Sequence, residues 1–343
     1  MPVGQFDLFG GAPEPAAKPS AKAADHRAPR RGDSDRAVPP AAQDSHLAGL
    51  GAALPQGVHL GTSSWSFPGW SGLVYEGSHS EVKLSRQGLG AYAAHPLLRT
   101  VGIDRTFYAP MAEADFRRYA NQARAVAPEF RFLVKAPMLF TGPRLRSDDG
   151  QWTDNPAFLN AVLATAQFVQ PATQGPLVFQ FPPLGPRFTR APQRFADALA
   201  EFLLALPRLY GSAFYAVEVR DQELLTDDYL AALCAGGATH CIAIHARMPP
   251  AATQGRFWRD AGRLPLVVRW SLHSGMKYEE AKERYAPFNA LVDEDPEGRE
   301  QVAVLIAEAV RREIAAYIIV NNKAEGSAPL TIHKLADRLV QRS

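Results

Sequence analysis

Eight short apolar segments recur between residues 58 and 322, and no other feature of the chain limits its fold as strongly. They are residues 58–64, 98–108, 130–136, 176–181, 214–220, 239–246, 264–270 and 315–322. They read as near-continuous apolar runs, which is typical of parallel strands buried on both faces. Amphipathic segments with helical periodicity lie around them, at residues 88–95, 111–127, 155–169, 191–207, 226–237, 298–314 and 331–339. The pattern predicts an α/β fold, a (β/α)8 barrel of the TIM type, with an open doubly wound sheet as the main alternative.

The N-terminal part differs sharply in composition from this pattern. From Gly10 to about Pro55 the sequence is rich in Ala and Pro, carries interspersed charges of both signs, and has almost no aliphatic anchors. Such a segment cannot bury enough apolar surface to offset its chain entropy. We therefore expect a disordered tail over residues 1–55 and the barrel over residues 56–343.

Charge and cysteine content exclude several classes of protein. The 37 basic and 35 acidic residues give a formal net charge of +2, so no global charge favours nucleic acid. The two cysteines are too few for a disulfide framework. No apolar stretch reaches membrane-spanning length, and the start of the chain lacks a signal-peptide pattern. These features predict a cytoplasmic protein without a membrane anchor.

Polar residues interrupt the ends of the predicted strands. In a (β/α)8 barrel the functional side chains lie at the carboxyl ends of the strands and in the loops that follow. The candidate catalytic residues are Glu218, Lys135 and Asp104. The candidate substrate-binding residues are Trp65, Tyr108, Gln180, Arg220, His245, Arg269, Asn321 and Asn322.

Each of these residues has a chemical role and a structural alternative. Glu218 is the best general acid or base if burial raises its pKa toward neutrality, whereas a salt bridge to Arg220 or Arg269 would make it structural. Lys135 suits anion binding, or nucleophilic attack on a carbonyl if it is desolvated. The arginines suit bidentate binding of phosphate or carboxylate. The alternative for the whole set is a network of buried ion pairs.

Metal binding has weaker support. Asp104, Glu218 and His245 could form a site, but no local spacing of ligands supports one. We therefore predict no metal and assign no cofactor.

Six motifs, in order, resemble the YecE-like family called domain of unknown function 72. They are GTSSWSFPGW, TFYAPM, FRFLVKAP, LVFQFPP, YAVEVRD and AYIIVNNKAEGSAP, and the resemblance runs from about Val58 to Val340. It implies a barrel similar to those of the sugar isomerases and endonuclease IV, but no reaction. The family usually has Glu and Asn where this chain has Gly102 and Asp104. A carboxylate at the end of the second strand is therefore lost, and Asp104 is the candidate replacement.

The pentapeptide QFDLF at residues 5–9 resembles the sliding-clamp-binding motif of bacterial replication and repair proteins. Leu8 and Phe9 would fill an apolar pocket, and the Gln5 amide would bind at its edge.

The sequence therefore leaves two functions open. One is an enzyme or ligand-binding barrel for a small anionic, sugar-phosphate or nucleotide-like group, tethered to the clamp. The other is a non-enzymatic adaptor that binds nucleic acid or protein in replication or repair.

Overall fold

Eight parallel strands form a closed barrel in the computed structural model, which describes residues 37–342 apart from Pro110, residues 142–174, Tyr210, Ser212 and Ser274. The strands are β1 (Val58–Thr62), β2 (Thr100–Ile103), β3 (Arg131–Lys135), β4 (Pro176–Gln180), β5 (Phe214–Glu218), β6 (Thr239–Ile244), β7 (Leu266–Trp270) and β8 (Ala316–Val320). Each strand pairs with its neighbour in sequence, and β1 pairs with β8. The predicted barrel is confirmed, and closure excludes the open doubly wound sheet.

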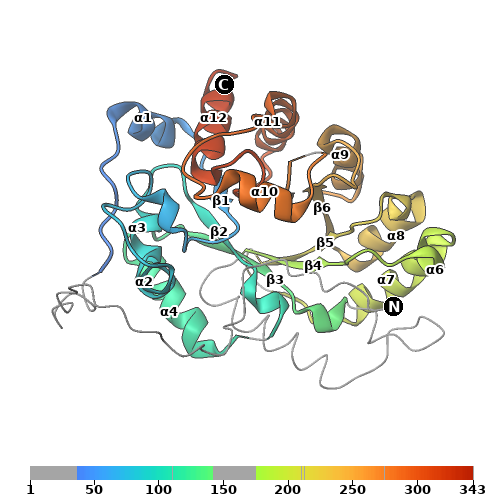
Figure 1. Ribbon diagram of the computed structural model, residues 1–343. Coiled ribbons are helices and arrows are strands. Elements are labelled where there is room, and N and C mark those ends of the chain that lie inside the picture. Colours follow the sequence, from blue (N-terminus) through green and yellow to red (C-terminus); the bar gives the residue numbers. More distant parts are fainter. Residues whose placement is uncertain are drawn as a thin grey trace, which may run out of the picture. The chain divides into compact units, whose positions relative to one another are not determined.

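Helices follow most strands and surround the barrel (Figure 1). The α-helices are α1 (Ser45–Ala53), α2 (Glu81–Gln87), α3 (Leu89–Ala93), α4 (Glu113–Arg124), α6 (Pro186–Thr189), α7 (Pro192–Ala205), α8 (Asp227–Gly236), α9 (Ala251–Asp260), α10 (Tyr278–Tyr285), α11 (Pro296–Arg311) and α12 (Ala328–Val340). The 3-10 helices are η1 (Pro68–Trp70), η2 (Arg105–Phe107), η3 (Met138–Phe140) and η5 (Gln222–Leu224). The helix expected at residues 155–169 lies outside the described residues. Within the described part of the chain, no helix is both long and apolar enough to cross a membrane.

Local sequence explains where several helices begin and end. The side chains of Ser80, Thr226 and Asp295 accept hydrogen bonds from backbone N–H groups in the first turns of α2, α8 and α11. Gly237 ends α8 in the left-handed conformation, with φ of 62°, which glycine adopts without steric cost. The segment predicted as a strand at 98–108 is extended only over β2, because η2 begins directly after Asp104.

Alternate residues of the strands fill the barrel interior. Side chains in a strand point to opposite faces with a period of two, so every second residue faces the barrel axis. One apolar cluster comes from such alternate positions, namely Leu133, Val178, Phe214, Ala216, Cys241, Val267, Tyr317 and Ile319. The intervening residues belong to the larger core between the strands and the helices.

The structure differs from the boundary expected at residue 55. The compact unit that contains the barrel begins at Val38, and residues 45–53 form helix α1. Leu47 and Leu50 of this helix are buried, and Asp44 caps its first turn by accepting a hydrogen bond from the N–H of Leu47 at 2.7 Å. The Ala- and Gly-rich composition hides these anchors at helical spacing. The rest of the expected tail, residues 1–36, lies outside the described residues.

Candidate functional site

A cluster of charged side chains lies at the carboxyl ends of β2, β3, β5 and β7, and Arg269 is at its centre. Its Nη1 donates to Glu218 Oε2 at 2.6 Å and to Gln180 Oε1 at 3.0 Å. Its Nη2 donates to both oxygens of Asp104, at 3.1 and 2.9 Å. Glu218 also forms an ion pair with Arg220. We call Asp104, Lys135, Glu218, Arg220 and Arg269 the mouth cluster.

The strand periodicity explains why these residues meet. Lys135 and Arg269 each lie two positions beyond a residue of the interior apolar cluster, Leu133 and Val267 respectively. The same relation joins Glu218 to Ala216 and Gln180 to Val178. The last inward-facing position of each of these strands is therefore polar, which places one charged layer on top of the apolar interior.

The pKa of Glu218 is lowered, as in the salt-bridge alternative, and not raised toward neutrality. Burial raises the pKa of this fully buried carboxyl, but the charges of Arg220, Arg269 and Lys135, with the hydrogen bond from Arg269, lower it to about 2. Glu218 is therefore an anion throughout the neutral range, and its charge balances buried guanidinium groups.

Lys135 is the group of the cluster that titrates near neutrality. Its side chain is 1% exposed, and Nζ lies 3.6 Å from the centre of the Phe107 ring. Burial, with smaller contributions from the charges of Arg269 and Arg220, lowers the pKa of Lys135 to about 7 against the opposing effect of Asp104 and Glu218. A desolvated amine of this kind can change its protonation state during ligand binding or catalysis.

Asn321 and Ser63 extend the polar layer to β8 and β1. Asn321 Nδ2 donates to Ser63 Oγ at 2.8 Å, and both side chains are buried. Ser63 is a residue that the sequence reasoning did not select. Its position directly after β1 and on the inward parity of that strand was the available signal.

Glycine at position 102 has a steric reason. A Cβ there would lie 3.3 Å from Ser63 Cα and 3.6 Å from Ile319 Cγ2, so a larger residue would crowd the interior. Asp104 is two residues further on the same face and binds Arg269. It therefore supplies a carboxylate at the end of β2 despite the departure at Gly102.

Two of the predicted binding residues serve packing in this structure. Trp65 Nε1 donates to the Leu84 carbonyl oxygen at 3.1 Å, and its ring packs edge-on against Tyr119. Asn322 Oδ1 accepts hydrogen bonds from the Trp70 indole at 3.2 Å and from the N–H of Ala328 at 2.9 Å. Asn322 therefore joins the loop after β1 to the start of α12.

The remaining predicted residues are His245, Tyr108 and the three residues of the N-terminal peptide. His245 follows β6, and burial, then the charge of Arg220, lowers its pKa to about 4. His245 is therefore neutral near pH 7. Tyr108 is 51% exposed, with its ring edge-on to Phe107. The partner-binding residues Gln5, Leu8 and Phe9 lie outside the described residues.

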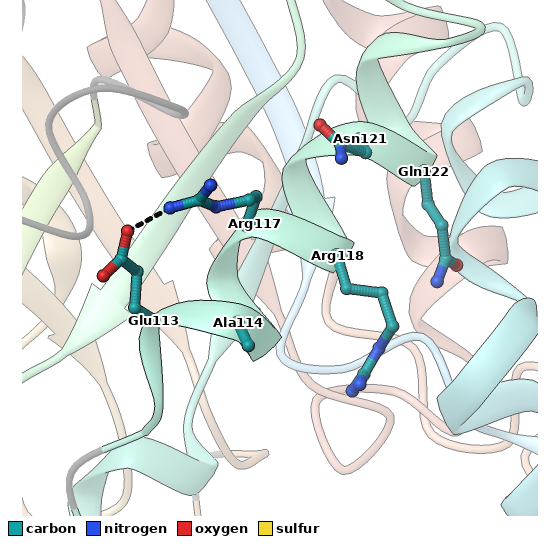
Figure 2. Close-up of a pocket in the computed structure, with 6 residues that line it drawn as sticks. All are labelled: Glu113, Ala114, Arg117, Arg118, Asn121 and Gln122. Atoms are coloured by element: carbon teal, nitrogen blue, oxygen red, sulfur yellow. Dashed lines mark hydrogen bonds and ion pairs between the residues drawn. The ribbon is translucent and has the colours of Figure 1, made fainter.

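Two surface hollows do not coincide with the mouth cluster. One is lined by residues of α4 alone, where Glu113 pairs with Arg117 one turn later and Arg118 points to the other side (Figure 2). The other, of about 240 Å³, lies beside His245 between the starts of α9 and α11. Asp104 and Glu218, the two carboxylates of the cluster, are both bound to guanidinium groups, so neither has the free oxygens of a ready metal ligand.

The fold and the site define a class of protein: a closed (β/α)8 barrel with a buried layer of charge at the carboxyl ends of its strands. The chain belongs to the family described as "Protein of unknown function DUF72", whose model matches residues 59–343. The resemblance found in the sequence motifs is thereby confirmed.

Solved structures of the same family have a similar fold. A DUF72 family protein from Thermotoga maritima MSB8 matches with a TM-score of 0.56 and 19% identity, over 82% of this chain and 98% of that chain. A DUF72 family protein from Enterococcus faecalis V583 matches with a TM-score of 0.53 and 14% identity, over 82% of this chain and 95% of that chain. Among curated proteins, none matches the chain. These comparisons show that other members of the family have a similar fold, and they name no reaction.

Proposed function

We propose that the mouth cluster binds a small anionic ligand that carries a phosphate or carboxylate group, in a cytoplasmic protein. The observation that supports this is a buried guanidinium nitrogen among gathered cations. Three cationic groups, on Lys135, Arg220 and Arg269, share the cluster with two carboxylates, on Asp104 and Glu218. Arg220 Nε is buried and has no hydrogen-bond partner among the described residues, which is costly. A bound phosphate or carboxylate would accept a hydrogen bond from it.

The cations of the cluster have different roles in this proposal. Both terminal nitrogens of Arg269 donate to Asp104, Glu218 or Gln180, so it holds the carboxylates in place, while its Nε lacks a hydrogen-bond partner among the described residues. Arg220 is 9% exposed and donates to Ser271 Oγ at 3.3 Å in addition to its ion pair with Glu218. Its Nε has no hydrogen-bond partner among the described residues, although it is buried. Arg220 and Lys135 are therefore the groups assigned to the anion.

Any chemistry on the ligand would depend on Lys135. Glu218 stays ionised near neutral pH, whereas Lys135 is close to its midpoint there. An amine with a pKa near the working pH can transfer a proton or, in its neutral form, attack a carbonyl carbon. If the protein is an enzyme, Lys135 rather than Glu218 is therefore the proposed reactive group.

The test is a ligand screen by thermal shift, followed by calorimetry on the full chain. The panel contains inorganic phosphate, sugar phosphates, nucleotides and sugar acids, with neutral sugars as controls. Lys135→Met should lose binding of the anions. Lys323→Met is a matched control, because Lys323 is a second buried lysine that lies over the Tyr278 ring, 4.2 Å from its centre. Equal binding by both variants and the wild type would refute the assignment.

The clamp-like peptide supports a second, separable proposal: that the barrel is delivered to the bacterial sliding clamp. Gln5, Leu8 and Phe9 match the anchors of that motif. Purified clamp should bind the full chain, and Leu8→Ala/Phe9→Ala should abolish this while ligand binding at the mouth stays intact. A chain that responds to DNA or a protein partner but to no small anion would favour the adaptor function instead.

A further inference from the structure

Three potential metal ligands meet on the outside of the barrel, away from the mouth cluster. His46 lies on α1, and His333 and Asp337 lie one turn apart on α12 (Figure 1). One ligand atom from each residue lies within 4.8 Å of the others. Residues four apart share one face of a helix, so α12 presents a pair of ligands to α1.

The distances are compatible with a tetrahedral ion. Zinc bonds of about 2.0–2.1 Å to nitrogen and oxygen place ligand atoms about 3.3 Å apart in a tetrahedron. His46 Nε2 lies 3.0 Å from Asp337 Oδ1, and His333 Nε2 lies 3.7 Å from Asp337 Oδ2, the other oxygen of that carboxylate. The two spacings lie on either side of the tetrahedral value. Only the two imidazoles need to approach each other, and the exposed side chain of His46 is free of the core constraints that would prevent this.

The imidazole of His333 supplies an independent observation. Its Nε2 is buried and has no hydrogen-bond partner among the described residues. A buried polar atom without a partner is costly, and a missing ion is one of the ordinary explanations for it. The ion pair of His46 with Asp337 does not supply this hydrogen bond, and the Asp337 carboxylate, 3.7 Å from His333 Nε2, is beyond hydrogen-bond distance.

We propose that His46, His333 and Asp337 bind one Zn²⁺ ion, with water in the fourth position. Two imidazoles and one carboxylate are a ligand set that zinc commonly accepts with an open position. The ion would fasten α1, the first helix of the compact unit, to α12, the last. This site is independent of anion binding at the mouth.

The experiment uses the full chain without an affinity tag, made metal-free by chelator and dialysed against Zn²⁺. Bound zinc is counted by elemental analysis, and Co²⁺ is used as a spectroscopic probe. We expect one Zn²⁺ per chain, a rise in the unfolding temperature, and the intense visible bands of four-coordinate Co²⁺.

Variants decide whether the named residues hold the ion. His333→Ala and Asp337→Ala should each lower zinc affinity at least tenfold and weaken the Co²⁺ bands. His46→Ala should fold like the wild type, because the side chain of His46 is 63% exposed. His79→Ala is the control, since His79 is only partly buried and bonds only to the nearby Glu76 carbonyl oxygen among the contacts described. Zinc binding that is absent in the wild type, or unchanged in His333→Ala and His46→Ala, would overturn the proposal.

Discussion

Replacing Lys135 by Met should stabilise the protein at neutral pH while abolishing anion binding. Burial lowers the pKa of Lys135 from 10.5 to about 7. At about 1.4 kcal/mol for each tenfold change in proton affinity, this corresponds to a destabilisation on the order of 5 kcal/mol at low pH. Met fills a similar volume without a charge to desolvate. Stability gained by removing a functional group is the usual sign of a site selected for activity.

The pH dependence gives this prediction its sharpest form. Folded Lys135 binds its proton less tightly than in the unfolded chain, so the unfolded state holds more protons between about pH 7 and pH 10.5. Wild-type stability should therefore rise with pH in this window. The advantage of Lys135→Met is fully present below about pH 7 and should shrink by roughly 2 kcal/mol between about pH 7 and pH 9.

The assay is urea unfolding at several pH values in this range, followed by circular dichroism. Lys277→Met is the control, because Lys277 is exposed and its replacement should give no pH-dependent gain. A Lys135→Met protein that is less stable than the wild type at pH 7 would refute the reasoning. So would a difference that stays constant with pH, since burial would then not have lowered the pKa of Lys135.

Three further changes probe the framework of the site. Glu218→Gln should lower the free energy of unfolding in urea by about 3–5 kcal/mol, because it leaves buried guanidinium groups without a counter-charge. In the wild type, the free energy of unfolding should fall as pH is lowered from about 4.5 to about 2, as expected for a carboxyl with a depressed pKa. Gly326→Ala should lower the free energy of unfolding by roughly 1–3 kcal/mol. Gly326 has φ of 115°, and a Cβ there would lie 2.5 Å from the Ala290 carbonyl oxygen. An unchanged free energy of unfolding would mean that the loop around Gly326 moves to accept the Cβ without cost. Leu47→Ala should cost about 2 kcal/mol or more by thermal or urea unfolding if α1 packs on the barrel, and no loss would show that it does not.

The barrel was predictable because each strand carries its own signal. An apolar run such as 176–181 between two helical patterns needs no knowledge of its neighbours, and eight of them leave few arrangements. The composition of the site followed from the same rule, since Glu218 and Arg269 end or nearly end their strands. Helix α1 was missed because Leu47 and Leu50 stand alone in a segment of small residues.

The electrostatics of the site were not predictable from sequence. Arg220, which lowers the pKa of Glu218 most, lies two residues away, but Arg269 lies 51 residues away and reaches Glu218 at 2.6 Å only in the folded barrel. The sequence therefore left open whether burial or the guanidinium charges would dominate, and the charges do. The packing roles of Trp65 and Asn322 likewise depend on partners in distant loops, Leu84 and Trp70.

The most direct test of the central claim is the number of protons taken up when an anion binds. Sulfate, which does not titrate near pH 8, is added to the full chain in two calorimetry buffers with different heats of ionisation. Lys135 with a pKa of about 7 is mostly neutral at this pH, and an adjacent anion favours its charged form. We predict binding with uptake of a large fraction of one proton, which disappears in Lys135→Met. Absence of binding at millimolar sulfate, or binding without proton uptake, would contradict the account.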